Sequence, residues 1–347
     1  MRKPPAPRAA RLLLVSCLLA LCGREGLRAQ PRAARVGPTP MPPFERWVVS
    51  RAAGPDLDVY LAGDAARGPL TVFVTGSKCL PLFMLARGRV KSTLIGLDAF
   101  STERSRMRFA VVERRGLRSF GPPPASEEEA RREARCTPEH GGVSKPERVQ
   151  DVADVVAALR SEPWVERVFL LGHSEGADVA AGLARRLKGR GIAGIGLLSG
   201  AGPTWFFDDL VKARKQGDHA EAKHALDELI RIADGDRSGD YGGAPVIHQV
   251  TYAVESTGLD DLRKVLVPIF VAAGTRDDNV PIESADVFVA ELLRDPRHRV
   301  RYLTLPGMDH GYERDKVDLG ASVLKAFVDW ALGDDKKSRI DVGLPAL

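Results

Sequence analysis

The 347-residue chain has little cysteine, no run of apolar residues long enough to span a membrane, and no internal repeat. Its leading apolar stretch, Leu12 to Cys22, is too short to cross a bilayer, so the sequence predicts no stable membrane span. Two of the four cysteines, Cys17 and Cys22, belong to this leading segment. The absence of repeats excludes a solenoid or propeller built from this chain.

Residues 1–29 are predicted to be a secretory signal. A basic stretch precedes the apolar core, and Leu27-Arg28-Ala29 is a plausible cleavage site. Export of this kind places the mature protein in the periplasm or outside the cell. Leu14 to Cys17 resembles a lipoprotein box, which leaves lipid anchoring as the less favoured alternative.

The predicted mature chain also lacks net charge. The leader holds six of the 51 basic residues and one of the 46 acidic residues, which leaves 45 of each sign. A formally neutral chain without a basic patch gives no indication of a nucleic-acid partner. Two cysteines remain, Cys79 and Cys136, and an even pair in an oxidising compartment predicts a disulfide, with two free thiols as the alternative.

The most informative motif is Gly172-His173-Ser174-Glu175-Gly176. The apolar run Val168 to Leu171 predicts a strand before it, and the alanine-rich stretch after it predicts a helix. A serine on a tight turn between strand and helix is the setting in which its hydroxyl becomes a nucleophile. Side chains at the two glycine positions would clash with the flanking elements. Ser174 is therefore predicted to be a nucleophile.

Two later loops supply an acid and a histidine, each directly after a predicted strand. The apolar run Val265 to Ala273 predicts a buried parallel strand, and the loop after it carries Asp277. A second predicted strand, Val300 to Leu305, leads to His310. Catalytic groups collect at the carboxyl ends of parallel strands, so we expect these side chains to meet Ser174.

From about Phe44 to Leu332 the chain resembles the α/β-hydrolases, near the dienelactone-hydrolase and prolyl-oligopeptidase branch. The matches are the turn 172–176, the Gly-x-x-Asp-x-x-Val-Pro loop 274–281, the Gly-x-x-His-Gly loop 307–311, and the turn Glu113 to Gly116, where Glu113 replaces an aspartate. This resemblance implies an α/β fold with a mostly parallel central sheet flanked by helices.

The resemblance also implies a serine hydrolase with Ser174 as nucleophile, Asp277 as acid and His310 as base. Asp278 is the alternative acid because it is adjacent, but the spacing to Val280-Pro281 favours Asp277. An acyl-enzyme mechanism of this kind needs no cofactor.

Two backbone N–H groups are expected to form an oxyanion hole. One is that of Glu175, which follows the nucleophile. By analogy with the family the other is that of Ser77, in the loop after the predicted strand Leu70 to Thr75, with Lys78 as the alternative. The Glu175 side chain either selects a cationic substrate group or makes a structural salt link, and the salt link is favoured.

Residues 202–262 are predicted to be a helical cap over the site. The segment opens with Trp205, Phe206 and Phe207, which either line the acyl or leaving-group pocket or anchor the cap to the body. The cap histidines His219, His224 and His248 are expected to be solvated. The stretch 234–240 faintly resembles a calcium loop, but Pro245 stands where glutamate is needed, so no metal is expected.

The remaining organisation is predicted as follows. Residues 30–45 form a flexible lead-in, residues 46–201 and 263–333 form the core, and residues 334–347 form a C-terminal tail. Trp47 to Ser50 and Asp58 to Ala62 predict edge strands, and residues 121–145 predict an insertion.

The expected function is a secreted or periplasmic serine hydrolase of small carboxylic esters. A prolyl-oligopeptidase-type peptidase is the alternative enzyme, although those enzymes usually carry a large N-terminal propeller for which the chain before the third predicted strand is too short. A non-catalytic hydrolase fold used for binding is the alternative outside enzymes.

Overall fold

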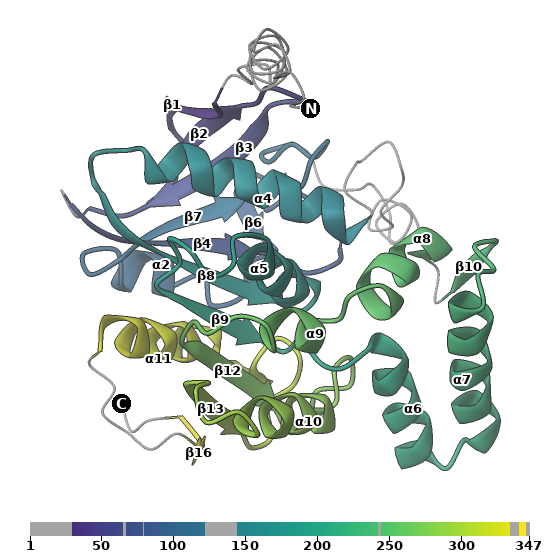
Figure 1. Cartoon of the computed structure of the whole chain (residues 1–347). Helices are drawn as coiled ribbons and strands as arrows, with labels where there is room; N and C mark the ends of the chain where they lie inside the picture. Colours follow the sequence, from purple (N-terminus) through teal and green to yellow (C-terminus); the bar gives the residue numbers. More distant parts are fainter. Residues whose placement is uncertain are drawn as a thin grey trace, which may run out of the picture.

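A central sheet of ten strands runs through the computed structural model, which describes residues 30–64, 67–78, 80–121, 144–241, 244–333 and 340–344 (Figure 1). In spatial order the strands are β1 (Arg32–Pro38), β2 (Glu45–Ser50), β3 (Leu57–Ala62), β7 (Arg108–Val112), β4 (Gly68–Val74), β8 (Val165–His173), β9 (Gly194–Leu198), β12 (Ile269–Gly274), β13 (Val300–Leu305) and β16 (Ile340–Val342). The pairs from β1 to β7 are antiparallel, and all later neighbours are parallel. The predicted mostly parallel α/β fold is confirmed.

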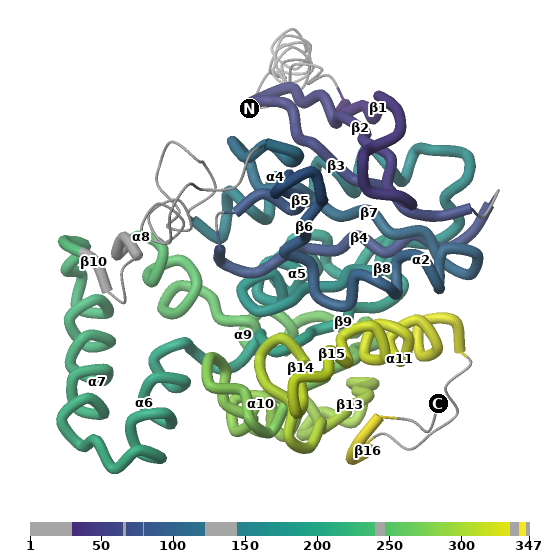
Figure 2. The backbone as a smooth tube through the Cα atoms, turned by 180° about the vertical axis from the view of Figure 1, so that it is seen from behind, coloured from purple at the N-terminus to yellow at the C-terminus, as the bar shows by residue number. Residues whose placement is uncertain are grey.

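Helices cover both faces of the sheet. The first face carries α4 (Lys145–Arg160), α5 (Glu175–Arg186), α9 (Gly258–Leu262) and α10 (Ile282–Leu293) (Figure 1). The opposite face carries α2 (Ala99–Thr102) and α11 (Gly320–Leu332), as the view from behind shows (Figure 2). Two short hairpins complete the body, β5 (Phe83–Ala86) with β6 (Arg89–Ser92) and β14 (Glu313–Arg314) with β15 (Val317–Asp318).

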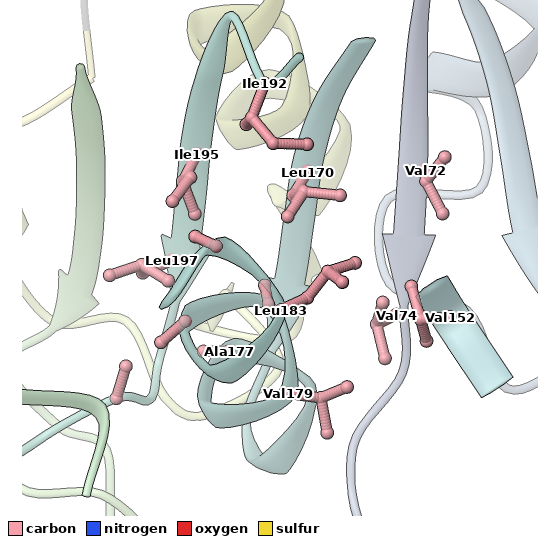
Figure 3. Close-up of a cluster of buried hydrophobic side chains, with 14 of the residues drawn as sticks. Val72, Val74, Val152, Leu170, Ala177, Val179, Leu183, Ile192, Ile195 and Leu197 are labelled. Carbon is pink, nitrogen blue, oxygen red and sulfur yellow. The ribbon is translucent and has the colours of Figure 1, made fainter. Parts of the chain in front are cut away.

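Helix α5 is buried against the middle of the sheet (Figure 3). Ala177 and Leu183 of this helix belong to the same buried cluster as Leu170 and Ile195 of the strands beside it. Small alanines along α5 let the helix lie close to the sheet, while fully burying each larger aliphatic side chain contributes roughly 1.5–3 kcal/mol. This packing fixes the start of α5, and with it the turn that precedes the helix.

The parallel strands in the middle of the sheet end along one edge. Val74 of β4 pairs with Gly172 of β8, and Gly274 of β12 pairs with Leu305 of β13. The loops that follow these four strands therefore leave the sheet at the same edge, where ligands and catalytic groups collect in such sheets.

A mostly helical segment, residues 202–262 of the predicted cap, is inserted between β9 and β12 and is called the cap below. It contains α6 (Trp205–Gln216), α7 (His219–Ala233), the short pair β10 (Asp240–Tyr241) and β11 (Ala244–Pro245), α8 (Val246–Gln249) and a π-helical turn, Val250–Val254. Helices α6 and α7 lie side by side and project from the body in both views (Figures 1 and 2). A small apolar cluster of Phe206, Ile232, Val250 and Ala253 holds the cap together.

The structure differs from the sequence predictions at both ends of the sheet. The predicted lead-in contains strand β1, which pairs with β2, so β2 and β3 are not edge strands. The predicted tail contributes β16, which pairs in parallel with β13. Alternation of arginine with small residues in β1 gave no apolar pattern to reveal it. None of the helices in the described ranges is both long and apolar enough to cross a bilayer.

Candidate active site

Ser174 occupies the turn between β8 and α5, with a φ of 55° and a ψ of −129°. A non-glycine residue rarely adopts such a conformation, and it persists only where the surroundings enforce it. A Cβ atom added at Gly172 would lie 2.1 Å from the Gly176 oxygen, and one added at Gly176 would lie 2.1 Å from the Val74 oxygen. Both glycines are therefore required for the turn to form against β4.

The loop after β4 passes directly beside Ser174. A Cβ atom added at Gly76 would lie 3.0 Å from the Ser174 Cβ and 3.4 Å from its Oγ. This close approach brings the neighbouring residues Ser77 and Lys78, both exposed, to the side of the serine. Both predicted oxyanion donors, the N–H groups of Ser77 and Glu175, thus belong to segments that adjoin Ser174.

Asp277 and His310 meet at the ends of β12 and β13. His310 Nδ1 lies 2.9 Å from Asp277 Oδ2 and 3.0 Å from Oδ1. The Asp277 carboxylate is buried, and its Oδ1 accepts hydrogen bonds from the backbone N–H groups of Asn279 at 2.9 Å and Val280 at 2.8 Å. Asp278, the alternative acid, is exposed. The structure therefore brings Asp277 to the histidine.

His173 joins the serine turn to the histidine loop. Its Nε2 lies 2.9 Å from the His310 oxygen, and the two imidazole rings are 4.9 Å apart. Burial lowers the pKa of His173 to about 4, so its ring is neutral at pH 7. Within the described residues no hydrogen bond joins Ser174 Oγ to His310, a contact that often tightens only when substrate binds.

Glu175 is the centre of a buried polar cluster that the sequence did not reveal in full. Its Oε1 accepts hydrogen bonds from Arg114 at 2.9 Å and from Arg148. Burial alone would raise the pKa of Glu175, but the charges of Arg114 and Arg148 hold it well below the usual range. The carboxylate is 1% exposed, which agrees with the favoured prediction of a structural salt link.

Two side chains of the cap complete this cluster. His248 Nε2 lies 2.7 Å from Glu175 Oε2, and the Tyr252 hydroxyl donates to Oε1 at 3.1 Å. The prediction that His248 is solvated is wrong, because the residue is only 7% exposed. The signal for burial of His248 was its position two residues before the mostly apolar stretch Val250–Val254. Its partner Glu175 could not be predicted in the same way, because it lies 73 residues away in sequence.

The predicted pocket aromatics take different positions. Phe206 is buried in the small core of the cap, in a cluster with Ile232, Val250 and Ala253. Trp205 stacks on Tyr252 at 4.9 Å, and its Nε1 donates to Asp178 Oδ2 at 3.2 Å. Phe207 is half-buried on α6.

Glu113 of the predicted family turn is buried beneath the loop that follows. It accepts hydrogen bonds from the Leu82 N–H and the Ser119 hydroxyl, and burial raises its pKa to about 7. A groove of about 780 Å³ lies beside this turn, and its lining does not include Ser174, Asp277 or His310.

Several predictions concern residues outside the described ranges. Cys79 and Cys136, the predicted disulfide, are among them, as is the leader 1–29. Among the described residues no group of three histidine, cysteine or carboxylate side chains is arranged to hold a metal ion.

Comparison with known proteins supports this reading of the fold. A sequence profile of the alpha/beta hydrolase fold matches residues 135–314, just over half of the chain. No curated protein sequence matches significantly. Est1E from Butyrivibrio proteoclasticus is similar in structure, with a TM-score of 0.52 and 16% identity over 83% of this chain and 99% of Est1E.

Two further solved structures are similar over part of their length. Dipeptidyl peptidase 4 from Porphyromonas gingivalis has a TM-score of 0.53 and 12% identity, over 84% of this chain and 35% of that protein. A puromycin hydrolase has a TM-score of 0.50 and 19% identity, over 89% of this chain and 42% of that protein. At these identities the likeness shows the fold.

Proposed function

Because this chain belongs to the alpha/beta hydrolase fold family and is a hydrolase, we propose that it cleaves carboxylic esters with a Ser174–His310–Asp277 triad. The observation that carries the proposal is the convergence of three loops. Ser174 holds a strained turn after β8, and His310 is bonded to the buried Asp277 at the ends of the neighbouring parallel strands.

The chemistry follows from these contacts. The Asp277 carboxylate accepts a hydrogen bond from the His310 Nδ1–H, which keeps the ring proton on Nδ1 and leaves Nε2 free to take the Ser174 hydroxyl proton. The serine oxygen attacks the ester carbonyl, the backbone N–H groups of Glu175 and Ser77 stabilise the oxyanion, and the imidazolium returns the proton to the leaving alkoxide. Water then attacks the acyl-enzyme by the same route, releasing the acid and restoring Ser174.

An ester is favoured over a peptide as the substrate. The match to Est1E spans nearly all of that protein, which has also been solved with ferulic acid bound. The match to the dipeptidyl peptidase spans only about a third of that enzyme. A small ester is therefore the proposed substrate class, and the predicted leader supports action in the periplasm or outside the cell.

Labelling with a fluorophosphonate probe tests the triad directly. Wild-type protein should be labelled at Ser174, and Ser174→Ala should not. A panel of p-nitrophenyl esters of graded chain length, assayed beside aminoacyl-anilides, then tests the substrate class. Absence of labelling would favour a non-catalytic binding protein, and faster cleavage of proline anilides than of esters would favour the peptidase.

A further inference from the structure

The arginines that hold Glu175 also bind the backbone of the loop beside Ser174. Arg114 Nη2 donates to the Gly76 oxygen at 2.9 Å, and Arg148 Nη2 donates to the Thr75 oxygen at 3.0 Å. Both guanidinium groups are almost completely buried, with side chains 3% and 6% exposed. Arg114 therefore bridges the Glu175 carboxylate and the Gly76 carbonyl, which immediately precedes Ser77. Arg148 bridges the same carboxylate and the Thr75 carbonyl one residue earlier, and its Nη1 also lies 3.5 Å from the Gly76 oxygen.

Peptide geometry converts this contact into a constraint on the oxyanion hole. The Gly76 carbonyl and the Ser77 N–H belong to one planar trans peptide, so they point in opposite directions. Fixing the carbonyl toward the arginines directs the N–H away from them. A Cβ atom added at Gly76 would lie 3.4 Å from Ser174 Oγ, so this peptide lies beside the proposed nucleophile.

We propose that Arg114 and Arg148, held by the Glu175 carboxylate, are positioning residues that orient the Gly76–Ser77 peptide for oxyanion binding. The inference rests on the proposed serine hydrolase function and names what sets the geometry of its oxyanion hole. Glu175 thereby serves both donors, since its own N–H is one and its side chain aligns the other through the arginines.

Charge in the cluster favours the same role. Two guanidinium groups share one carboxylate, so the cluster presents positive potential beside the peptide where negative charge develops. Donors fixed before the reaction need no reorganisation when the oxyanion forms, which is the source of their catalytic effect.

The cap contacts this cluster through two side chains. His248 is hydrogen-bonded to Oε2 of Glu175, and the Tyr252 hydroxyl donates a hydrogen bond to Oε1. Trp205 stacks on Tyr252 and packs edge-on against His248. The position of the cap is therefore linked by direct hydrogen bonds to the residues that orient the hole.

The test compares kcat, KM and the affinity for a trifluoromethyl ketone, which forms a charged tetrahedral adduct, in full-length variants. In Arg148→Met, kcat for a p-nitrophenyl ester should fall about 100-fold while KM stays within about threefold. The affinity for the ketone should fall by a similar factor. Glu175→Gln retains the backbone N–H but loses the charge, and it should show the same pattern.

Asp261→Asn is the matched control. Asp261 forms a buried ion pair with Lys145 at 2.7 Å, and this pair joins α4 to α9 without touching the Thr75–Gly76 carbonyls. The control should lower the melting temperature as Arg148→Met does, yet keep kcat within about twofold of wild type. If Arg148→Met does not fold, Arg148→Lys replaces it, because lysine keeps the charge but lacks the planar fork whose two Nη atoms bond the Glu175 carboxylate and the Thr75 carbonyl separately.

The outcomes separate the two proposals. Failure of wild type to react with a fluorophosphonate would contradict the serine hydrolase function and, with it, this inference. If wild type reacts and the folded Arg148 and Glu175 variants keep kcat, the cluster is merely structural and the inference alone is overturned. A large rise in KM at unchanged kcat would also overturn it, since that pattern indicates lost substrate binding.

Discussion

The surrounding structure constrains the Asp277 side chain more than the His310 side chain. The Asp277 carboxylate is fully buried and has three polar partners, the His310 ring and two backbone N–H groups. The His310 side chain is 20% exposed, so it can reach substrate and solvent water. General-base catalysis requires an imidazole that can reach the substrate and a second group that orients this imidazole. The buried carboxylate of Asp277 suits the second role, and the more exposed ring of His310 suits the first.

Substitutions at these residues should have graded effects on turnover. We expect Ser174→Ala and His310→Ala to lower kcat by about 10⁶-fold, and Asp277→Asn by about 10⁴-fold, because the acid only orients and stabilises the imidazole. Initial rates with a p-nitrophenyl ester measure these losses. Melting temperatures near that of wild type would show that the fold is intact.

Asp278→Asn supplies the control for the acid. The side chain is exposed and adjacent to Asp277, so a neutral replacement should leave turnover within about twofold of wild type. Full activity in Asp277→Asn together with an inactive Asp278→Asn would reverse the assignment.

At the scale of residues, the sequence was sufficient to predict those candidate site residues that stand in short local motifs. Ser174, Asp277 and His310 each follow a strand and lie among glycines, so short motifs are sufficient to predict them as candidates. Arg148 and His248 stand in segments without such a motif, and they reach Glu175 only through packing of α4 and the cap. Contacts set by tertiary packing are not encoded in local spacing.

At the scale of elements, the chain that leaves β9 toward the cap packs directly against the backbone of the Ser174 turn. A Cβ atom added at Gly200, just after β9, would lie 2.3 Å from the Ser174 oxygen and 3.0 Å from the Ala177 Cβ. The backbone on both sides is fixed by the sheet, so the clash cannot be relieved without moving the turn.

Gly200→Ala should therefore impair catalysis as well as stability. We expect kcat to fall at least about tenfold and the free energy of unfolding to fall by roughly 1–3 kcal/mol. Gly217→Ala is the control, because Gly217 has a φ of 72° with nothing within 4 Å of the added Cβ. The control should cost about 1–2 kcal/mol of strain and leave kcat unchanged. Equal activity in both variants, measured beside chemical denaturation, would contradict this role of Gly200.

The contact between the cap and α10 contains a carboxyl group, that of Asp208, whose pKa is shifted. Asp208 of α6 bonds the hydroxyl of Ser284, and burial raises the pKa of Asp208 to about 8. Between the ordinary aspartate pKa and about 8, the folded state keeps a proton that the unfolded state has lost. Stability contributed by this group therefore falls as pH rises through that window.

We expect the wild-type protein to lose about 2 kcal/mol of stability through Asp208 between about pH 6.5 and pH 8.5. Asp208→Asn keeps a hydrogen-bonding side chain and removes the titration, so its loss over the same range should be smaller. Glu113 titrates in the same direction, with a pKa of about 7, but it is present in both proteins and cancels in the comparison. Identical pH dependence of urea unfolding in the two proteins would show that Asp208 does not titrate in this window.

Element prediction succeeded where apolar residues run continuously and failed where they do not. The predicted strand Val300 to Leu305 has the bounds of β13. The only large aliphatic residue of strand β1 is Val36, which is exposed, and the strand forms by pairing with the edge of β2. A strand of that kind is defined by its neighbour rather than by its own composition.

At the scale of the whole molecule, the position of β1 constrains the cleavage site of the predicted leader. The strand begins at Arg32 and pairs Arg32 with Ser50. Cleavage after Ala29 leaves β1 complete, whereas cleavage a few residues later would remove its pairing with β2.

Expression of the full chain with export should therefore yield a protein that begins at Gln30. N-terminal sequencing of the secreted or periplasmic material measures this directly. A chain cut inside β1, or one that keeps residues 1–29, would contradict the predicted signal.

The predicted disulfide between Cys79 and Cys136 would act on both stability and catalysis. Closing a loop of this length could stabilise the chain by about 4 kcal/mol on the chain-entropy model. Cys79 follows Ser77 and Lys78, the end of the loop that Arg114 and Arg148 hold through its carbonyls. Protein purified from the periplasm should resist alkylation until it is reduced, and reduction should lower both the melting temperature and kcat.

Cys136→Ser distinguishes a bond from two free thiols, because it removes the partner that lies far from Ser77 in sequence. If the bond exists, this variant should match the reduced wild type in melting temperature and in kcat. If both cysteines are free, the variant should behave as the untreated wild type and reduction should change nothing. Retained kcat together with a lowered melting temperature would show that the bond stabilises the chain while the arginines alone keep the Gly76–Ser77 peptide in place.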